Sequence, residues 1–198
     1  MHTRTETFRD LYHGTDAESA LKICEEGFIP SSAENNWCGS GVYFYDIKAK
    51  AWWSANRTCR QKNRQEGRKF DSAIIVADII DILRNDIFDL RSDVDMRSFQ
   101  IVVQEIVEGV RLGISELNET ERTIKLRSLL IEFFAKKYQK KLVVGMFQQR
   151  PNEEHAELQS FSNGLDIIFG AELIYCVKDL SILQNIRRGG MKHEENIT

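Results

Sequence analysis

Proline is nearly missing from this chain, with 2 prolines in 198 residues, and long apolar runs are missing as well. No stretch approaches the ~20 consecutive apolar residues that a membrane-spanning helix needs. The first residues, MHTRTETFRD, lack the apolar core of a secretory signal peptide. These absences argue against proline-rich linkers, membrane insertion and secretion. We therefore expect one cytoplasmic domain over residues 1–198, with no membrane partner and a disordered tail at 189–198.

Metal-binding patterns are also missing. The 4 cysteines form neither a CxxC pair nor a Cys/His cluster with zinc spacing; they are Cys24, Cys38, Cys59 and Cys176. We therefore expect scattered, reduced thiols and no metal. The hydrophobic content of 42% and the charged content of 29% are ordinary for a globular protein. The net charge of −3 says little about partners.

The segment from Leu11 to Ala55 carries the clearest functional signals. Its pattern predicts a strand that ends at His13-Gly14-Thr15, followed at once by an amphipathic helix. Thr15 and Glu18 have the spacing of a capping box, and Gly27 stands where the helix should stop in left-handed geometry. A strand–helix junction leaves backbone N–H and C=O groups free for a ligand. A glycine there lets the ligand approach the main chain closely.

A second strand is predicted after Gly39-Ser40-Gly41, in the apolar run Val42–Tyr45. Asp46 has the chemistry of a helix N-cap, and the helix after it carries Trp52 and Trp53. Histidine, tyrosine and tryptophan side chains thus come from neighbouring elements. Together they suit a flat slot in which an aromatic heterocycle stacks, with its polar edge on backbone groups.

The order of these motifs resembles a known enzyme family. HGT at 13–15, G-x-G-V-Y-F at 39–44 and an alanine-rich helix with aromatics are similar to the diphtheria-toxin/poly(ADP-ribose) polymerase type of ADP-ribosyltransferase. That family holds NAD with a His–Tyr–Glu triad, and its glutamate stands on a late strand before an apolar run. Glu172 in GAELIYCV fits that pattern. The resemblance covers residues 8–56 and 157–185, and the middle of the chain matches no family that we can name.

The resemblance implies an α+β fold, a split antiparallel β-sandwich with flanking helices, and NAD as co-substrate without a metal. By resemblance, His13 binds the adenosine-side ribose and the Gly14 backbone reads the nicotinamide carboxamide. Tyr43 stacks on the nicotinamide ring, and Glu172 binds the nicotinamide-ribose hydroxyl and stabilises positive charge in the transition state. The family's second aromatic position is Ser54 here, so Trp52 or Trp53 is expected to cover the other ring face.

The expected catalytic residues are therefore His13, Tyr43 and Glu172. The expected NAD-binding residues are His13, Gly14, Thr15, Tyr43, Trp52 and Trp53. Each side chain also has a structural interpretation when it is considered singly. His13, Tyr43 and the two tryptophans suit a core, and Glu172 could cap a strand end or pair with Lys178.

The remaining chain predicts a central strand at 73–80, a loop with a short element at 81–96, and two helices. The helices are expected from Phe99 to about Gly113 and from about Thr120 to Lys140. A buried strand at 142–147, a hairpin at 158–169 and the Glu172 strand follow. The two helices could form plain core, a lid, a substrate platform or the docking surface of an antitoxin protein.

One basic cluster stands out at 57–69, RTCRQKNRQEGRK, where Glu66 is the single acid. Its basic residues are Arg57, Arg60, Lys62, Arg64, Arg68 and Lys69. A solvated helix end explains this cluster as well as a patch for a phosphate backbone does. The second explanation places an RNA or DNA acceptor close to the reactive sugar, and overall acidity does not oppose it because such footprints are local.

The sequence thus predicts an NAD-dependent ADP-ribosyltransferase that modifies a macromolecule, with nucleic acid favoured over protein. The small size resembles bacterial or phage-defence toxins, which implies an antitoxin partner. The alternatives are an NAD glycohydrolase with water as acceptor and an inactive NAD- or ADP-ribose-binding module. An RNA 2′-phosphotransferase shares an HGT-like motif and is disfavoured because that family has a winged-helix half before the motif.

Overall fold

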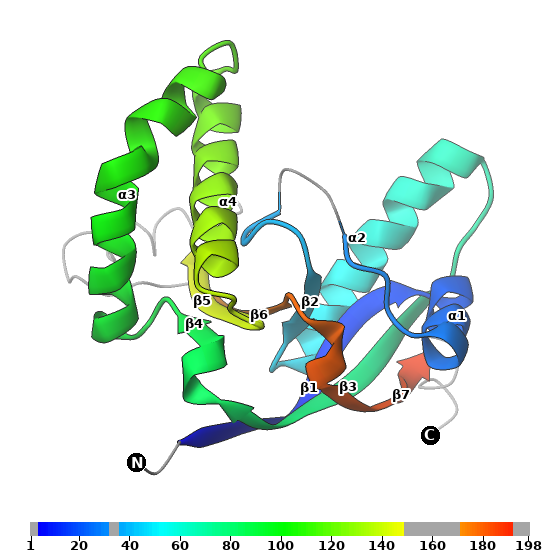
Figure 1. Ribbon diagram of the computed structural model, residues 1–198. Helices are drawn as coiled ribbons and strands as arrows, with labels where there is room; N and C mark the ends of the chain where they lie inside the picture. Colours follow the sequence, from blue (N-terminus) through cyan, green and yellow to red (C-terminus); the bar gives the residue numbers. More distant parts are fainter. Residues whose placement is uncertain (1–3, 32–35, 149–170, 192–198) are drawn as a thin grey trace, which may run out of the picture.

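The computed structural model describes residues 4–31, 36–148 and 171–191 (Figure 1). They form a mixed α+β fold of one seven-stranded sheet and four α-helices. The strands are β1 (Thr5–Asp16), β2 (Val42–Tyr45), β3 (Ser72–Leu83), β4 (Ile87–Asp89), β5 (Leu142–Gln148), β6 (Ala171–Val177) and β7 (Leu183–Met191). The helices are α1 (Ala17–Glu26), α2 (Lys48–Glu66), α3 (Asp93–Gly113) and α4 (Glu119–Lys137). The α+β prediction is confirmed.

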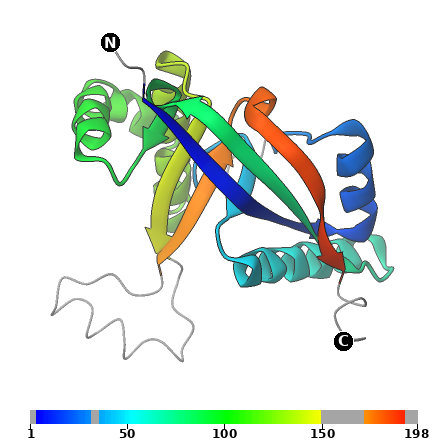
Figure 2. The same cartoon turned by 90° about the horizontal axis from the view of Figure 1, so that it is seen from below.

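The sheet has the order β4-β5-β6-β2-β1-β3-β7. Its pairs are antiparallel except β4–β5, which is parallel and so departs from the fully antiparallel sheet that we expected. β1 and β2 share a single register pair, Tyr12↔Tyr45, whereas β1 and β3 pair along almost their whole length. Figure 2 shows that β1, β3 and β7 run in a different direction from β5 and β6. The sheet therefore has two parts joined at a narrow seam between β1 and β2.

The helices cover the two parts separately (Figure 1). α3 and α4 stand side by side over β4 and β5, and α1 and α2 lie beside β1 and β3. β3 can be buried on both faces because its run Ser72–Ala77 is almost entirely apolar. Ile75 and Ala77 belong to the main core, whereas Ile74 and Val76 pack under α2.

The main core crosses the seam. It joins Leu11 and Ile75 of one part to Phe44, Val144 and Val177 of the other part. A second core lies under α3 and α4. Its centre is a cluster of Phe88, Phe99 and Phe134, in which the Phe88 and Phe134 ring centroids are 4.3 Å apart. In the described part of the chain, no helix has the length and apolar character needed to cross a membrane.

Several predicted element ends differ from the structure. α1 is capped by Asp16, whose carboxylate accepts from the Ser19 N–H, and not by Thr15 in a capping box. Gly27 does end α1 with a positive φ of 88°, but its ψ of −179° is not left-handed helical geometry. α2 begins after Ile47 without a side-chain cap, so the Asp46 prediction was wrong.

The C-terminal prediction was partly wrong as well. β7 continues to Met191, with Gly190 opposite Ile74 and Met191 opposite Ala73. Gly189–Met191 are therefore part of the sheet and not of a frayed tail. The predicted hairpin at 158–169 lies outside the described residues, and so do residues 192–198. The strands at 73–80 and 142–147 and the existence of both central helices are confirmed, and α3 ends at Gly113 as expected. α3 begins at Asp93, six residues earlier than predicted and inside the segment 81–96 that was expected to be a loop with a short element.

Candidate functional site

His13 lies at the seam where the β1–β2 ladder stops. Its Nδ1 is 2.8 Å from the Tyr43 carbonyl oxygen, so a side chain joins the two strands beyond the single backbone register pair. A carbonyl oxygen can only accept a hydrogen bond, and Nδ1 must therefore carry the proton. This tautomer leaves Nε2 with its lone pair, as an acceptor for a hydroxyl group.

The surroundings of His13 keep its imidazole neutral. The ring packs edge-on against Phe28, with centroids 5.2 Å apart, and lies 5.7 Å from the Phe44 ring. Burial lowers the pKa of His13 below its ordinary value, although the bond to the Tyr43 carbonyl acts in the opposite direction. His13 is thus suited to accepting a hydrogen bond from a neutral group rather than to binding an anion by charge.

Gly14 allows another group to approach the main chain closely, and in the structure that group is the backbone of helix α2. A Cβ at Gly14 would lie 2.0 Å from the Ala51 carbonyl oxygen and 2.7 Å from the Ala55 nitrogen. The glycine is therefore required for packing α2 on β1, a role that sequence reasoning did not assign. Thr15 is buried in the sheet opposite Ala73.

Tyr43 is engaged through its hydroxyl group. The hydroxyl donates to the Gly39 carbonyl and accepts from the Cys38 N–H at 3.1 Å, which closes the turn ahead of β2. Burial raises the pKa of Tyr43 far above its usual range, so the group stays a neutral phenol. Because the hydroxyl serves the turn, the ring is the part of Tyr43 that remains suited to a flat ligand.

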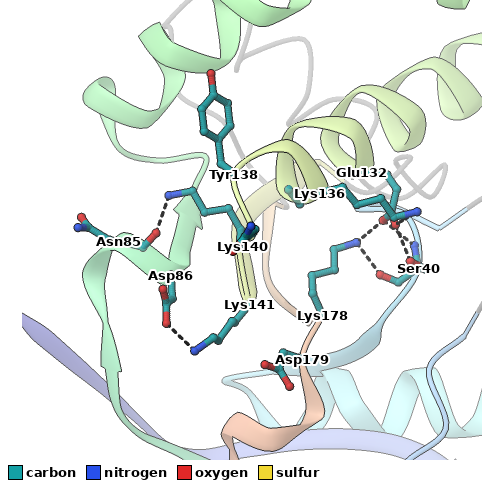
Figure 3. Close-up of a pocket in the computed structure, with 12 residues that line it drawn as sticks. Ser40, Asn85, Asp86, Glu132, Lys136, Tyr138, Lys140, Lys141, Lys178 and Asp179 are labelled. Atoms are coloured by element: carbon teal, nitrogen blue, oxygen red, sulfur yellow. Dashed lines mark hydrogen bonds and ion pairs between the residues drawn. The ribbon is translucent and has the colours of Figure 1, made fainter.

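A largely buried ion pair at the edge of a surface hollow also holds this turn (Figure 3). Lys178 Nζ donates to the Cys38 carbonyl at 2.6 Å and to the Ser40 carbonyl at 2.5 Å. It also contacts Glu132 of α4 at 2.6 Å, and Glu132 accepts from the Ser40 N–H and hydroxyl at 3.1 and 2.7 Å. Lys178 thus pairs with Glu132, and the structural alternative in which it pairs with Glu172 was wrong. We call Lys178, Glu132 and Ser40 the turn clamp.

Glu172 is a buried carboxylate, only 6% exposed, and lies opposite Phe147 of β5. It forms an ion pair with Lys50 of α2, whose side chain is 42% exposed. Tyr45 lies opposite Ile174, two residues along β6 from Glu172. Burial, and after it the charge of Glu172, raises the pKa of Tyr45, whose hydroxyl is hydrogen-bonded to Ser54.

Tyr43 and Glu172 are on one face of the sheet. Cross-strand neighbours share a face and alternate residues along a strand do the same. Tyr43 is opposite Cys176 and Tyr45 is opposite Ile174, and both β6 residues are in phase with Glu172. Tyr12 joins this face through Tyr45, so the adjacent His13 belongs to the other face. The structure therefore places two of the three expected catalytic side chains on one face of the sheet, four β6 residues apart in register, and leaves His13 in the seam on the other face.

The two tryptophans of α2 have different surroundings. Trp52 packs, half-buried, in the cluster of Tyr12, Tyr45 and Ile74. Trp53 is 47% exposed on the outer side of the helix, with the Arg57 guanidinium 5.6 Å from its ring centroid. Of the two, only Trp52 is close to Tyr45 and to the face that carries Glu172.

Sequence reasoning missed Lys50 and Arg127. Lys50 stands four residues before Ser54, and residues at i and i+4 share a helix face. This spacing is the sequence signal that places Lys50 on the same face as the expected second aromatic position. Arg127 of α4 lies 4.1 Å from the Trp37 ring centroid and 5.7 Å from that of Phe147, and so borders the same face. Its Nε is buried without a partner among the described residues. No local pattern could have indicated this contact, since it depends on how α4 crosses β5.

The basic cluster divides into engaged and exposed groups. Lys62 pairs with the buried Asp16 at 2.5 Å, and Arg68 contacts Glu18 and Glu66. Arg57, Arg60, Arg64 and Lys69 are exposed. Lys62 and Arg68 thus serve the structure, and only the second group stays available to an acceptor.

A hollow of about 700 Å³ lies between α4 and the starts of β4 and β5 (Figure 3). It is lined by Ser40, Asn85, Asp86, Glu132, Ala135, Lys136, Tyr138, Gln139, Lys140, Lys141, Lys178 and Asp179. Its lysines already have partners. Lys141 pairs with Asp86, Lys178 with Glu132, and Lys140 donates to the Asn85 carbonyl. None of the expected site residues lines it, so we do not regard it as the active site.

The outer side of α3 is apolar at three exposed positions. Val94, Ile101 and Leu112 are 73%, 60% and 76% exposed, and their spacing places them on one helix face. An antitoxin that docks on these helices stays a prediction. Among the residues that the structure describes, no group of three or more His, Cys, Asp or Glu residues could hold a metal ion.

The chain resembles one archaeal protein over part of its length. No protein-family model matches the chain, and no solved structure matches it. A stretch of 112 residues is 33% identical to the uncharacterized protein MJ0359 of Methanocaldococcus jannaschii. The match covers 54% of this chain and 48% of the archaeal protein, so the chain spans about half the length of that relative. This relative carries no assigned activity.

Proposed function

We propose that the chain transfers ADP-ribose from NAD to a macromolecular acceptor. The observation that carries the proposal is the buried Glu172 carboxylate, which shares a sheet face with Tyr43 and is paired with Lys50 of the neighbouring helix. A buried carboxylate at such a point suits the stabilisation of a sugar that becomes positively charged. The seam between β1 and β2 also supports the split sheet that this family has.

The reaction assigns a separate task to each side chain. The Tyr43 ring would stack on nicotinamide, and His13 Nε2 would accept a hydrogen bond from an adenosine-ribose hydroxyl. Glu172 would accept one from the nicotinamide-ribose hydroxyl and stabilise charge at C1′. The C1′–N bond breaks, and its electron pair leaves with neutral nicotinamide. The acceptor forms the new bond to C1′ and releases a proton to solvent.

The test uses NAD labelled in its adenylate half, incubated with separate pools of RNA, single-stranded DNA and cell protein. Glu172→Gln keeps the shape of the side chain and removes its charge. We expect label in at least one pool with the wild-type protein, and a loss of ~10²-fold or more in the variant. Glu116→Gln, at an exposed position on the α3–α4 connection, is the matched control and should keep full activity.

The other outcomes are equally informative. Wild-type turnover in Glu172→Gln would contradict the assignment of that residue. Release of nicotinamide without labelled polymer would replace the transferase by an NAD glycohydrolase. Binding of NAD without any consumption would favour an inactive binding module. A toxin role predicts that wild-type expression arrests growth and that Glu172→Gln expression does not.

A further inference from the structure

The outer face of α2 carries one aromatic and several basic residues in a single line. Lys50, Trp53, Arg57, Arg60 and Arg64 follow each other at spacings of three and four residues. Such spacings keep side chains on one face of a helix, and the buried residues Ala51, Ala55 and Cys59 mark the opposite face. We call these five residues the α2 stripe. In Figure 2, α2 lies at the periphery of the molecule.

The charges of the α2 stripe have no competing acids along the helix. The only acidic residue of α2 is Glu66 at its end, and Glu66 is engaged with Arg68. Within the described ranges, Arg57, Arg60 and Arg64 form no ion pair, and the Arg57 guanidinium lies 5.6 Å from the Trp53 ring centroid. The cations from Arg57 to Arg64 are therefore available to an external anion, in a protein whose net charge is −3.

The α2 stripe leads to the candidate catalytic residue. Its first member, Lys50, is the ion-pair partner of Glu172. At a rise of 1.5 Å per residue, the stripe extends about 21 Å from there to Arg64. A linear ligand that binds along the stripe thus lies close to the Glu172 carboxylate at one end and contacts arginines at the other.

We infer that the α2 stripe binds a single-stranded nucleic acid and presents it to the Glu172 site, an inference that rests on the proposed function. A line of cations fits a polyanionic backbone with regular phosphates. The half-exposed Trp53 indole fits an unpaired base, because sites for single-stranded nucleic acid combine positive charge with aromatic side chains on which bases stack. A duplex offers no free base face to Trp53, and an acidic peptide makes no use of the indole in this way.

The test measures binding without NAD, so that it is independent of catalysis. Labelled 20-nucleotide oligo(U) and oligo(dT), together with a duplex of the same length, are titrated with the full chain over a series of salt concentrations. We expect single strands to bind more tightly than the duplex. The oligo(U) and oligo(dT) arms decide between RNA and DNA.

Two pairs of variants test whether oligonucleotide binding depends on the α2 stripe or only on the overall charge of the protein. Arg60→Gln with Arg64→Gln should weaken binding about tenfold and reduce the salt slope by about 1.4, at roughly 0.7 for each phosphate contact. Lys22→Gln with Arg97→Gln removes the same charge from exposed positions of α1 and α3 and should change little. Trp53→Ala should weaken single-strand binding at least about fivefold. Phe133→Ala, at another exposed aromatic of 42% exposure, should not.

Two results would overturn the inference. One is stripe variants that bind like their controls, and the other is a duplex that binds as tightly as the single strands. Failure of the proposed function is distinguishable from both. If no pool consumes NAD while stripe variants still lose oligonucleotide binding, the enzyme assignment fails and the binding site stands. If protein alone is labelled and oligonucleotides do not bind, the enzyme stands and the inference fails.

Discussion

His13 combines a structural task with a chemical property. Its Nδ1–H bonds the Tyr43 carbonyl where the β1–β2 ladder has stopped, and its ring is packed between two phenylalanines. Charging this ring would place a cation in an apolar cluster. The same burial that lowers its pKa therefore links the proton equilibrium of His13 to the stability of the seam.

We expect the free energy of unfolding to fall as the pH drops below the ordinary histidine value of 6.5. The unfolded chain takes up a proton there, whereas folded His13, with its lowered pKa, does so only at lower pH. The loss is at most about 1.4 kcal/mol per pH unit from one histidine. Urea unfolding between pH 7 and pH 5 measures it. His13→Asn keeps an N–H donor for the Tyr43 carbonyl and should have a smaller slope. Equal slopes would contradict this account.

At the scale of elements, the contact between β1 and α2 depends on one missing side chain. Gly14→Ala would push a methyl group into the Ala51 carbonyl, so α2 must move away from the sheet. We expect a loss of about 3 kcal/mol in the free energy of unfolding, at the upper end for overpacking. Gly109→Ala is the control, because its new Cβ meets nothing within 4 Å inside α3. It should stabilise by up to about 1 kcal/mol. Similar urea midpoints for both variants would contradict the packing argument.

The turn clamp joins β6, α4 and the turn before β2. Lys178→Met would leave the largely buried Glu132 without its main partner and remove the donor of two carbonyl groups. Breaking a fully buried pair costs about 3 kcal/mol or more, so for this pair, which is 11% and 15% exposed, we expect a loss of about 2 kcal/mol. Lys136→Met removes another partner of Glu132, but that lysine is 75% exposed and should cost less than about 0.5 kcal/mol. Chemical denaturation of both variants gives the comparison, and comparable losses would show that burial does not decide the effect.

How much of this could be predicted from the sequence differs between elements. Periodicity located α1, α3 and α4, because burial of one face leaves a regular pattern, and short apolar runs located the central strands. α2 was predicted from Asp46 and the family resemblance, and its cap was wrong. Capping residues were less informative. Thr15 and Asp16 are both good N-caps, and the structure shows that Asp16 takes the position: it accepts from the Ser19 N–H in the first turn and pairs with Lys62 of α2. The sequence analysis predicted no strand for β7, and it assigned Gly189 and Gly190 to a disordered tail because glycine has low strand propensity, which pairing with β3 overrides.

The candidate site shows the same limit. Glu172 and Tyr43 were found from local motifs, and the structure brings them to one face. Their positions as catalytic residues stay a prediction. Lys50, the ion-pair partner of Glu172, and Arg127, which stacks on Trp37, depend on how helices cross the sheet. The spacing of Lys50 and Ser54 indicates a shared helix face, but the pairing of Lys50 with Glu172 and the contact of Arg127 with Trp37 join residues too distant in sequence to leave a local pattern.

At the scale of the whole molecule, the narrow seam raises the question of whether the two parts unfold separately. The main core crosses the seam and combines residues of both parts, so we expect one cooperative transition. Two probes test it. Trp37 packs on Phe147 in one part, with ring centroids 5.1 Å apart, and Trp52 packs on Ile74 in the other. Two double variants each keep a single tryptophan. Trp52→Phe with Trp53→Phe keeps Trp37, and Trp37→Phe with Trp53→Phe keeps Trp52. Both should give the same urea midpoint, and two separate midpoints would show independent parts.

One face of α2 packs against the sheet, and the opposite face is exposed in the described structure. Ala51, Ala55 and Cys59 are fixed by their neighbours, but Trp53, Arg57, Arg60 and Arg64 point outward. A library randomised at these four outward positions would therefore sample new surface chemistries on an unchanged scaffold. Through such changes, descendants of this protein could acquire different targets while their sheet and its buried glutamate stay as they are.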